Sequence, residues 1–395
     1  MFQTKRKNTD ILGRVIRQAF LFLLVLAVCT ALWPGEAFAA QSPPSVSAKA
    51  AALIRADTGE LLYGKQENER LAMASTTKIM TALLALEQAA QSNPEITITQ
   101  EMVAVEGSSM GLRAGYRLTL RDLAAGMLSV SGNDAANAAA IAMAGSKEAF
   151  AGRMNAKAAE LGMENTHFVT PSGLDDEAHY STAKDMAVLG AAAIRNPDFL
   201  AICSQKQVKV TYLEPEQTVM LGNHNRLLSM YEGCIGVKTG FTKKAGRCLV
   251  SAAERDGVQL VAVTLNAPDD WNDHKALLDY GFSLLHEYPV EQTRSEFSVP
   301  VVGAQQDTVW VKAKESGRVV LKEGEDSRLQ REVELPRFLY GPLTQGQQVG
   351  LVRYTLEGET VWETPLLVQE DIAAIPAKKS WLSRLWDTVC RWFGG

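Results

Sequence analysis

Three short motifs rich in serine, lysine and amide side chains occur in order along this 395-residue chain. They are Ser75-Thr76-Thr77-Lys78, Ser131-Gly132-Asn133 and Lys238-Thr239-Gly240. A serine hydroxyl is a weak nucleophile at neutral pH and needs a neighbouring base. A lysine serves as that base only where burial or a second cation disfavours its charged form. Residues three apart on a helix are neighbours, so the Lys78 amine can reach the Ser75 hydroxyl, and Lys238 could be the second cation. The set of motifs predicts a site for serine acyl transfer.

Each motif alone has a structural explanation. The segment 181–184 repeats the Ser-x-x-Lys spacing, so spacing does not choose the nucleophile. Ser75 is favoured because the long apolar run 79–86 follows it, which predicts the start of a buried helix. The motif at 131–133 is equally well explained as a helix N-cap. The motif at 238–240 lies in a predicted β-hairpin, where its lysine could be an ordinary edge-strand residue and its glycine would let a substrate backbone approach.

With these motifs in place, the chain resembles the penicillin-binding serine DD-peptidases, specifically the low-molecular-mass D-alanyl-D-alanine carboxypeptidases of peptidoglycan metabolism. The resemblance covers roughly residues 45–370. It rests on six blocks in family order: 74–81, 111–115, 131–136, 168–174, 179–186 and 236–242. The block that contains Ser181 is not the nucleophile block of the family. The implied fold is an α/β (α+β) β-lactamase/transpeptidase-like sandwich with a central antiparallel sheet flanked by helices. A small all-β C-terminal domain and an amphipathic helix are expected to follow it.

The resemblance implies catalytic roles for four residues. Ser75 is expected to attack the carbonyl of the penultimate D-Ala, and Lys78 to take the proton of its hydroxyl. Ser131 and Asn133 are expected to complete the proton relay and to hold the peptide amide. Water would then cleave the acyl-enzyme, and neither a metal nor a cofactor is expected.

Substrate binding is expected along the strand that carries the third motif. The resemblance implies that Lys238 and Thr239 bind the terminal carboxylate of the substrate beside Gly240. The backbone N–H groups of Ser75 and Phe241 would form the oxyanion hole.

The chain departs from the family pattern at one point. Carboxypeptidases of this group usually carry an arginine near the substrate carboxylate, either after the fourth strand or just before the Lys-Thr-Gly strand. Here the segment 265–274 contains no arginine, and the segment 223–226 offers His224 and Arg226. Each of these two is a candidate replacement, and each is equally well explained as a surface residue.

The predicted reaction removes the terminal D-Ala from the peptidoglycan stem pentapeptide, with β-lactams as inhibitors that acylate Ser75. The same site could act as a DD-endopeptidase or transpeptidase, depending on water access to the acyl-enzyme. A β-lactamase would need a deacylating base, for which the sequence has no recognisable signature. An inert wall-binding protein would have no physical reason to retain all three motifs.

Composition and the N-terminus indicate an exported globular enzyme. The chain is 46% apolar and 22% charged with a formal net charge of -5, and it has no basic tract that would indicate nucleic-acid binding. A basic region at 5–17, an apolar run at 19–32 and Ala37-Phe38-Ala39 predict a signal peptide over 1–39. A catalytic domain over 40–290, a β-rich domain over 291–374 and a helix over 375–395 are expected to follow.

The C-terminal segment is predicted to bind a membrane surface. On a helical wheel, residues 378–393 place three tryptophans on one side and most of the polar residues on the other, with Lys378 and Lys379 leading. At about 14 residues the helix is too short to span a bilayer, so it is expected to lie in the interface. Peripheral attachment to the outer face of the cytoplasmic membrane follows, and the alternative is a helix docked on the protein's own surface.

Four cysteines remain after the predicted cleavage, namely Cys203, Cys234, Cys248 and Cys390. Cys234 and Cys248 fall on the two arms of the predicted hairpin around Lys238-Thr239-Gly240. They could form a disulfide, or they could be two thiols that pack as small apolar groups.

Overall fold

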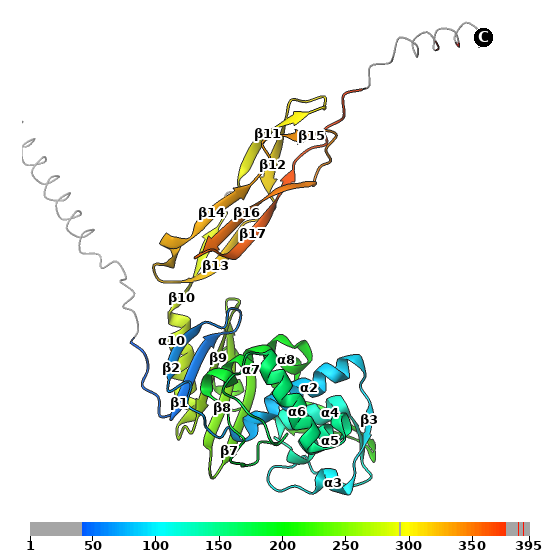
Figure 1. Cartoon of the computed structure of the whole chain (residues 1–395), viewed down its shortest axis with the longest axis vertical. Coiled ribbons are helices and arrows are strands. Elements are labelled where there is room, and N and C mark those ends of the chain that lie inside the picture. Colours follow the sequence, from blue (N-terminus) through cyan, green and yellow to red (C-terminus); the bar gives the residue numbers. More distant parts are fainter. Residues whose placement is uncertain (1–41, 292–293, 377–385, 387–389, 391–395) are drawn as a thin grey trace, which may run out of the picture. The chain divides into compact units, whose positions relative to one another are not determined.

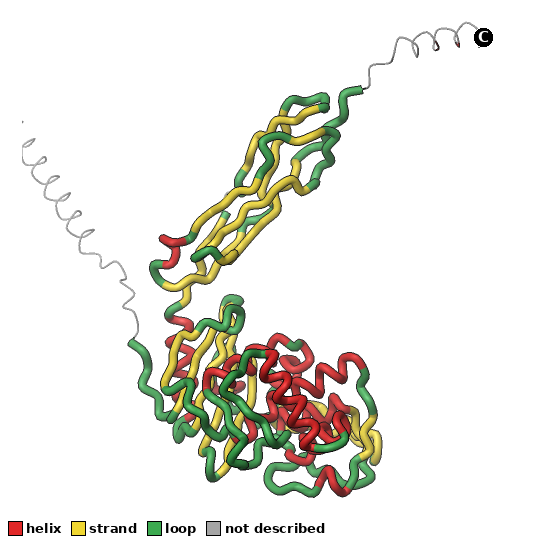
Figure 2. Tube along the Cα trace, viewed as in Figure 1, coloured by secondary structure: helices red, strands yellow, loops and turns green. Residues whose placement is uncertain are grey.

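The computed structural model describes residues 42–291 and 294–376, together with residues 386 and 390. An α/β domain precedes a domain built from strands (Figure 1 and Figure 2). The predicted signal peptide lies outside the described residues, and so does almost all of the predicted amphipathic helix, which therefore stays a prediction. The remaining elements match the expected sandwich with its central antiparallel sheet and all-β domain.

The α/β domain is organised around a five-stranded antiparallel sheet with the order β2-β1-β9-β8-β7. Its strands are β1 (Ala50–Arg55), β2 (Leu61–Lys65), β7 (Cys234–Thr242), β8 (Gly246–Arg255) and β9 (Val258–Leu265). The central strands β8 and β9 are buried along most of their length because both faces of the sheet are covered. β7, which carries the Lys-Thr-Gly motif, ends the sheet and leaves one edge of its backbone available.

Helices cover both faces of this sheet. α10 (Asp270–Ser283) packs on one face through Leu277 and Leu278, against Leu53 and Leu249. The other face packs on a larger helical layer with α2 at its centre. The helices on this side are α2 (Lys78–Gln91), α3 (Gln100–Val103), α4 (Leu120–Ser129), α5 (Asn133–Ala144), α6 (Lys147–Glu160), α7 (Ala183–Arg195) and α8 (Pro197–Cys203). The short α9 (Leu227–Met230) instead packs through Leu227 in the cluster of α10.

Local sequence explains where these helices begin. α4 follows Thr119 and α7 follows Thr182, and in each case the threonine side chain accepts a backbone N–H of the first turn. α8 begins after Asn196, whose side chain accepts from two backbone N–H groups. No single helix among the described residues is long and apolar enough to cross a membrane. Only α7 and α8 together meet the criteria of length and composition, as a pair bent by 102°.

A four-stranded sheet with the order β3-β4-β5-β6 lies beside the helical layer. Its strands are β3 (Glu95–Thr97), β4 (Arg117–Thr119), β5 (Gln207–Glu214) and β6 (Glu216–Gly222). β5 alternates exposed and buried residues, and it turns Val208, Val210 and Tyr212 into the core.

The β domain contains a six-stranded sheet with the order β14-β16-β17-β12-β11-β15 and a separate pairing of β10 with β13. Its strands are β10 (Leu285–Val290), β11 (Glu296–Val302), β12 (Thr308–Ala313), β13 (Gly317–Lys322), β14 (Gln330–Glu334), β15 (Leu339–Tyr340), β16 (Gln348–Leu356) and β17 (Glu359–Val368). Val299, Val311, Val352 and Leu366 belong to a core cluster that shares no residue with the cores of the α/β domain.

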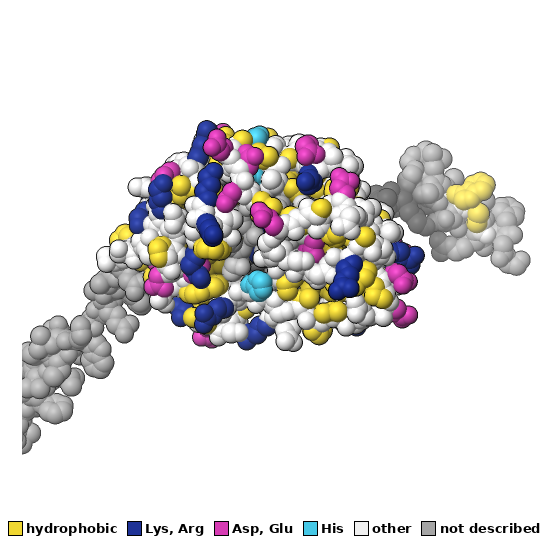
Figure 3. Space-filling model, turned by 90° about the horizontal axis from the view of Figure 1, so that it is seen from below, with side chains coloured by type: hydrophobic (Ala, Val, Ile, Leu, Met, Phe, Trp, Pro, Cys, Tyr) yellow, Lys and Arg dark blue, Asp and Glu magenta, His cyan; other side chains and the backbone are white. Residues whose placement is uncertain are grey.

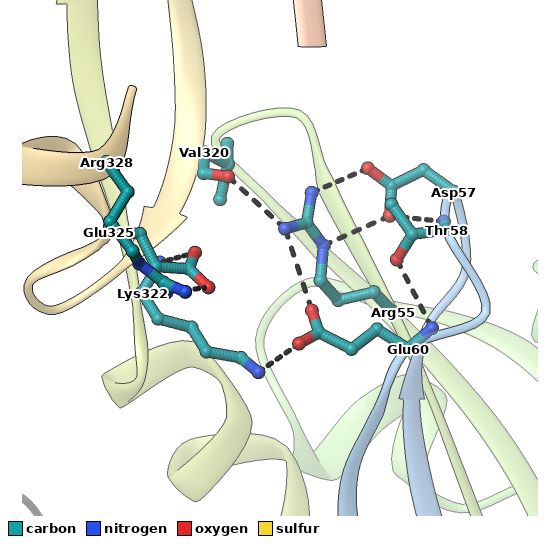
Figure 4. Close-up of polar contacts among 8 residues, drawn as sticks. All are labelled: Arg55, Asp57, Thr58, Glu60, Val320, Lys322, Glu325 and Arg328. Carbon is teal, nitrogen blue, oxygen red and sulfur yellow. Dashed lines mark hydrogen bonds and ion pairs between the residues drawn. The ribbon is translucent and has the colours of Figure 1, made fainter. Parts of the chain in front are cut away.

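Polar contacts join β13 to the hairpin of β1 and β2 (Figure 4). The guanidinium of Arg55 donates to the carbonyl of Val320 at 3.2 Å, and it also holds Asp57. Lys322 forms an ion pair with Glu60. These contacts are hydrogen bonds and ion pairs of partly exposed side chains.

The cysteines in the described residues are free thiols, which matches the second of the two alternatives. The strand register explains why. Cys234 pairs with Ala253 at one end of the β7–β8 hairpin, whereas Cys248 pairs with Gly240 near the other end. The two thiols therefore do not lie opposite each other.

Candidate active site

Ser75 lies in a short 3₁₀ turn, η1 (Ala74–Thr77), that leads directly into α2. The hydroxyl of Thr76 donates to the carbonyl of Met73 at 2.6 Å, and that of Thr77 donates to the carbonyl of Ala74 at 2.8 Å. Ala74 has a φ of 48°, a left-handed conformation that L-residues rarely adopt. The turn is thus held by its own side chains. Ser75 stays partly exposed while its neighbours are buried.

Lys78 is fully buried, and three oxygen atoms surround its amine. Nζ lies 2.9 Å from Ser75 Oγ, 2.6 Å from Asn133 Oδ1 and 2.7 Å from the carbonyl oxygen of Ser172. A neutral amine has two N–H donors and one lone pair. The amide and carbonyl oxygens can take the two donors, which leaves the lone pair to accept the proton of Ser75 Oγ.

Burial and charge favour the neutral form of Lys78. Burial, followed by the nearby Lys238, holds the pKa of Lys78 well below its ordinary value, against a smaller opposing effect of Asp134. Burial also lowers the pKa of Lys238 to about 7. Burial therefore favours the neutral form of both amines.

The second motif lies at the start of α5. Asn133 is the first residue of the helix, and its Nδ2 donates to the carbonyl of Glu106 at 2.7 Å, which turns Oδ1 toward Lys78. Ser131 has a φ of 62° and lines the cleft. The N-cap position belongs to Gly132 with no side-chain cap, so this motif does not act as a capping serine.

Asp134 holds the loop in front of this motif. Its carboxylate accepts from Ser109 Oγ at 2.6 Å and from the backbone N–H groups of Met110 and Leu112. The backbone N–H of Asn133 donates to the carbonyl of Ser108 at 2.7 Å. The loop 106–112 is thereby fixed to the start of α5, and it brings Ser108 to the cleft.

The third motif lies on the edge strand β7, directly against the turn η1. Lys238 is 1% exposed, and its Nζ donates to the carbonyl of Thr239 at 2.9 Å. A Cβ at Gly240 would lie 3.0 Å from the backbone nitrogens of Ser75 and Thr76, so only glycine allows this approach. Phe241 follows with a side chain that is 65% exposed.

A loop over residues 168–176 supplies the Ser172 carbonyl that faces Lys78. His179 holds this loop: its Nδ1 accepts from the backbone N–H groups of Val169 and Thr170, and its Nε2 contacts Thr77 Oγ1 at 2.8 Å. Burial lowers the pKa of His179 to about 4, so the ring is neutral at pH 7. His179 was not among the residues predicted from the sequence. Its only signal was its place in the block that begins at 179.

Part of each motif lines a cleft of about 290 Å³, whereas Lys78, Asn133 and Lys238 are buried behind its lining. It is lined by Ser75, Ser108, Ser131, His224, Thr239, Gly240, Phe241, Arg247, Asp270 and Trp271. His224, one of the two candidate replacements for the missing arginine, is in this lining, and Arg226 is not. Arg247 was missed in the sequence, although the hairpin register could have placed it opposite Phe241. Figure 3 views the α/β domain from below and shows lysine and arginine side chains gathered along one half of that face.

Ser181 is not placed to act as a nucleophile. Its side chain is fully buried, its hydroxyl contacts Thr166 Oγ1 at 2.7 Å, and its backbone pairs with Leu71. The lysine of the same segment, Lys184, is exposed.

Comparison with known proteins identifies the family of the chain. Residues 37–269 match the family model of the D-alanyl-D-alanine carboxypeptidases, and residues 292–374 match that of the penicillin-binding protein 5 C-terminal domain. The chain belongs to the D-alanyl-D-alanine carboxypeptidase family of serine peptidases.

Relatives match over nearly the whole chain. D-alanyl-D-alanine carboxypeptidase DacF of Bacillus subtilis is 33% identical over 89% of this chain and 94% of its own length. DacC of Escherichia coli is 34% identical, with 97% of each chain covered. Among solved structures, penicillin-binding protein 5 of Haemophilus influenzae superposes with a TM-score of 0.60 at 30% identity, covering 84% of this chain and 99% of that one. The Streptomyces K15 DD-transpeptidase gives a TM-score of 0.59 at 32% identity, covering 62% of this chain and 100% of that one.

Proposed function

We propose that this carboxypeptidase removes the terminal D-alanine of peptidoglycan stem peptides through an acyl-enzyme on Ser75. The observation that carries the proposal is the 2.9 Å contact between Lys78 Nζ and Ser75 Oγ. This contact lies in a buried site whose two other oxygens accept from the amine and leave its lone pair to the hydroxyl. A serine next to a neutral amine is an activated nucleophile.

Acylation begins when the Ser75 hydroxyl proton moves to Lys78 Nζ and Oγ bonds to the carbonyl carbon of the penultimate D-alanine. The negative charge that develops on the carbonyl oxygen is stabilised by the backbone N–H groups of Ser75 and Phe241. The C–N bond then breaks, and the leaving D-alanine takes a proton at its amine through Ser131. Water attacks the ester, which releases the shortened peptide and returns the proton to Ser75.

Substrate is held on both sides of this bond. Asn133 binds the peptide amide on the acyl side, and the edge of β7 pairs with the extended peptide backbone. Lys238 and Thr239 bind the carboxylate of the leaving residue. β-Lactams react at the same serine because they present an amide carbonyl and a carboxylate in a similar arrangement.

A second reaction at the same site has support from one relative. The K15 enzyme, which this chain resembles over its α/β domain, is described as a DD-transpeptidase. If an amine replaces water, the acyl group passes to a second peptide instead of being hydrolysed. A cross-linked peptide would be cut in the same way by endopeptidase action.

The experiment measures labelling by a fluorescent penicillin and D-alanine release from diacetyl-Lys-D-Ala-D-Ala, for the mature protein and its Ser75→Ala and Ser181→Ala variants. Label and release are expected to disappear with Ser75→Ala and to persist with Ser181→Ala. Product analysis with a D-amino acid added as acceptor separates hydrolysis from transfer. Label without D-alanine release from the peptide would favour a cross-linked substrate, and absence of label would overturn the acyl-enzyme.

The proposed location is the outer face of the cytoplasmic membrane. The domain limits 1–39, 40–290, 291–374 and 375–395 belong to this proposal, with the first segment removed on export and the last bound to lipid. The support is the sequence pattern of the two terminal segments. Deleting residues 377–395 is expected to move the exported enzyme from the membrane fraction to the soluble fraction without loss of penicillin labelling. Unchanged membrane association would overturn the anchor.

A further inference from the structure

Arg247 lies on the same side of the β7–β8 hairpin as the substrate-binding threonine. In the strand register, Arg247 pairs with Phe241 and Leu249 pairs with Thr239. Paired residues share a face and alternate residues return to it, so Thr239 and Arg247 are diagonal neighbours on one face. Arg247 and Thr239 both line the cleft that contains Ser75.

The guanidinium of Arg247 is held from behind by the start of α10. Its Nε and Nη2 donate to Asp270 Oδ1 at 3.0 and 2.6 Å, and its Cζ lies 5.5 Å from the ring centre of Trp271. The side chain of Asp270 is 4% exposed, whereas that of Arg247 is 41% exposed. Within the described part of the chain, Nη1 of Arg247 has no hydrogen-bond partner.

Arg247 and Lys238 differ in how their charge depends on pH. Lys238 is buried and its Nζ is already bonded to a backbone carbonyl, and burial lowers its pKa to about 7. A guanidinium keeps its charge at every pH at which the protein is folded, and its planar donors match a carboxylate. The cleft is therefore lined by a cation that is fixed, partly exposed and permanent, whereas the charge of the buried Lys238 amine varies with pH.

We propose that Arg247, held by Asp270 and Trp271, binds the free carboxylate of the substrate's terminal residue and makes the enzyme selective for peptides that end in one. This inference rests on the proposed function, and it assigns to Arg247 the selectivity of that reaction for its leaving residue. A cross-linked peptide bears a longer chain at that position, so a site that requires a free carboxylate favours carboxypeptidase over endopeptidase action. The hairpin strand thereby supplies the arginine that the segment 265–274 lacks.

The test compares the wild-type enzyme with Arg247→Leu on two peptides, diacetyl-Lys-D-Ala-D-Ala and the same peptide ending in D-alaninamide. Loss of a charge-assisted hydrogen bond is expected to lower kcat/KM on the free acid roughly 10- to 100-fold. On the amide, which lacks the negative charge, kcat/KM is expected to stay within about 2-fold. Penicillin G and its methyl ester offer the same contrast for the rate of acylation.

Three further substitutions test how Arg247 acts. Arg226→Leu is the control: it removes the arginine that the sequence suggested, and kcat/KM on both peptides is expected to stay unchanged. Asp270→Asn keeps the Arg247 side chain but removes the anion that positions it, so KM for the free acid is expected to rise more than kcat falls. Thermal unfolding of all variants confirms that each one is folded, and Arg247→Lys provides a second folded variant with a charge but without the planar donors.

The outcomes separate this proposal from the reaction on which it rests. An equal loss on acid and amide peptides in Arg247→Leu would overturn the carboxylate contact while the carboxypeptidase activity stands. The carboxylate contact is also overturned if Arg247→Leu keeps the wild-type preference for the acid over the amide peptide. If the wild-type enzyme cleaves neither peptide, the proposed function fails and this inference fails with it.

Discussion

At the scale of single residues, the two buried lysines explain how a serine hydroxyl can react near neutral pH. In the proposed reaction, Lys78 needs to be neutral to accept the proton of Ser75. Burial accounts for the largest part of its lowered pKa, and the nearby Lys238 contributes the next largest part. Because the two amines interact, the pH dependence of acylation reports the pair and not one residue.

Removing Lys238 is therefore expected to shift this pH dependence in a defined direction. Lys238 repels a positive charge on Lys78, so Lys238→Gln raises the pKa of Lys78 and leaves less neutral amine at a given pH. The acidic limb of the acylation rate is expected to move to higher pH. The measurement is the second-order rate of penicillin acylation from pH 5 to 9. Thr239→Ala serves as the control, since it weakens binding without removing a charge. A limb that stays in place or moves to lower pH would contradict the coupling.

At the scale of elements, the sequence predicted those parts of the site whose residues are close together along the chain. Ser75 and Lys78 lie on one turn, and the helix and the hairpin that carry the motifs follow from apolar runs and glycines. The contacts that complete the site are long-range. Ser172 comes to Lys78 on a loop held by His179, and Asp270 comes to Arg247 from the start of α10.

The missed arginine illustrates the same limit. The search for it in the sequence covered the segments that directly precede or follow the expected strands, 223–226 and 265–274. Arg247 lies on the neighbouring strand, and only the register of the hairpin brings it beside Thr239. The strand register also excludes the disulfide, because Cys234 and Cys248 lie at different ends of the same hairpin.

His274 ties α10 to the sheet and makes this contact sensitive to acid. Its two ring nitrogens lie 2.5 Å from Ser251 Oγ on β8 and 2.9 Å from Thr264 Oγ1 on β9. Burial lowers its pKa to about 3, whereas a histidine in the unfolded chain titrates near pH 6.5. The folded state thus binds fewer protons, so its stabilisation is complete above about pH 6.5 and is lost as the pH falls toward 3.

Replacing this residue is expected to reduce the acid sensitivity. The contribution of His274 to the loss between pH 7 and pH 4.5 is about 3 kcal/mol, since each pH unit below 6.5 corresponds to about 1.4 kcal/mol. His274→Gln keeps hydrogen-bonding groups and cannot be protonated, so its free energy of unfolding is expected to change less over this range. Urea unfolding at the two pH values measures the difference, with the exposed His167→Gln as the control. An identical pH dependence in His274→Gln and wild type would contradict the assignment.

At the scale of the whole molecule, the separation of the cores determines how the two domains depend on each other. The clusters of the α/β domain and the main cluster of the β domain have no residue in common, and among the described residues the apolar contacts that the strands β10 and β13 make with the α/β core are limited to Leu285 and Val320. The contacts of Arg55 with Val320 and of Lys322 with Glu60 are polar and partly exposed, and such contacts contribute about 1 kcal/mol or less each. A ligand that stabilises one domain should therefore have little effect on the stability of the other.

Calorimetry of the mature protein is accordingly expected to show two unfolding transitions. Acylation of Ser75 by penicillin adds contacts in the cleft of the α/β domain, so it is expected to raise the midpoint of one transition and leave the other within about 1 °C. The Ser75→Ala variant, which cannot be acylated, is the control and is expected to show no shift. Glu60→Ala, which breaks the ion pair with Lys322, is expected to leave both midpoints nearly unchanged. A single transition that moves as a whole on acylation would mean that the two cores unfold together and that the polar contacts between them are stronger than their exposure predicts.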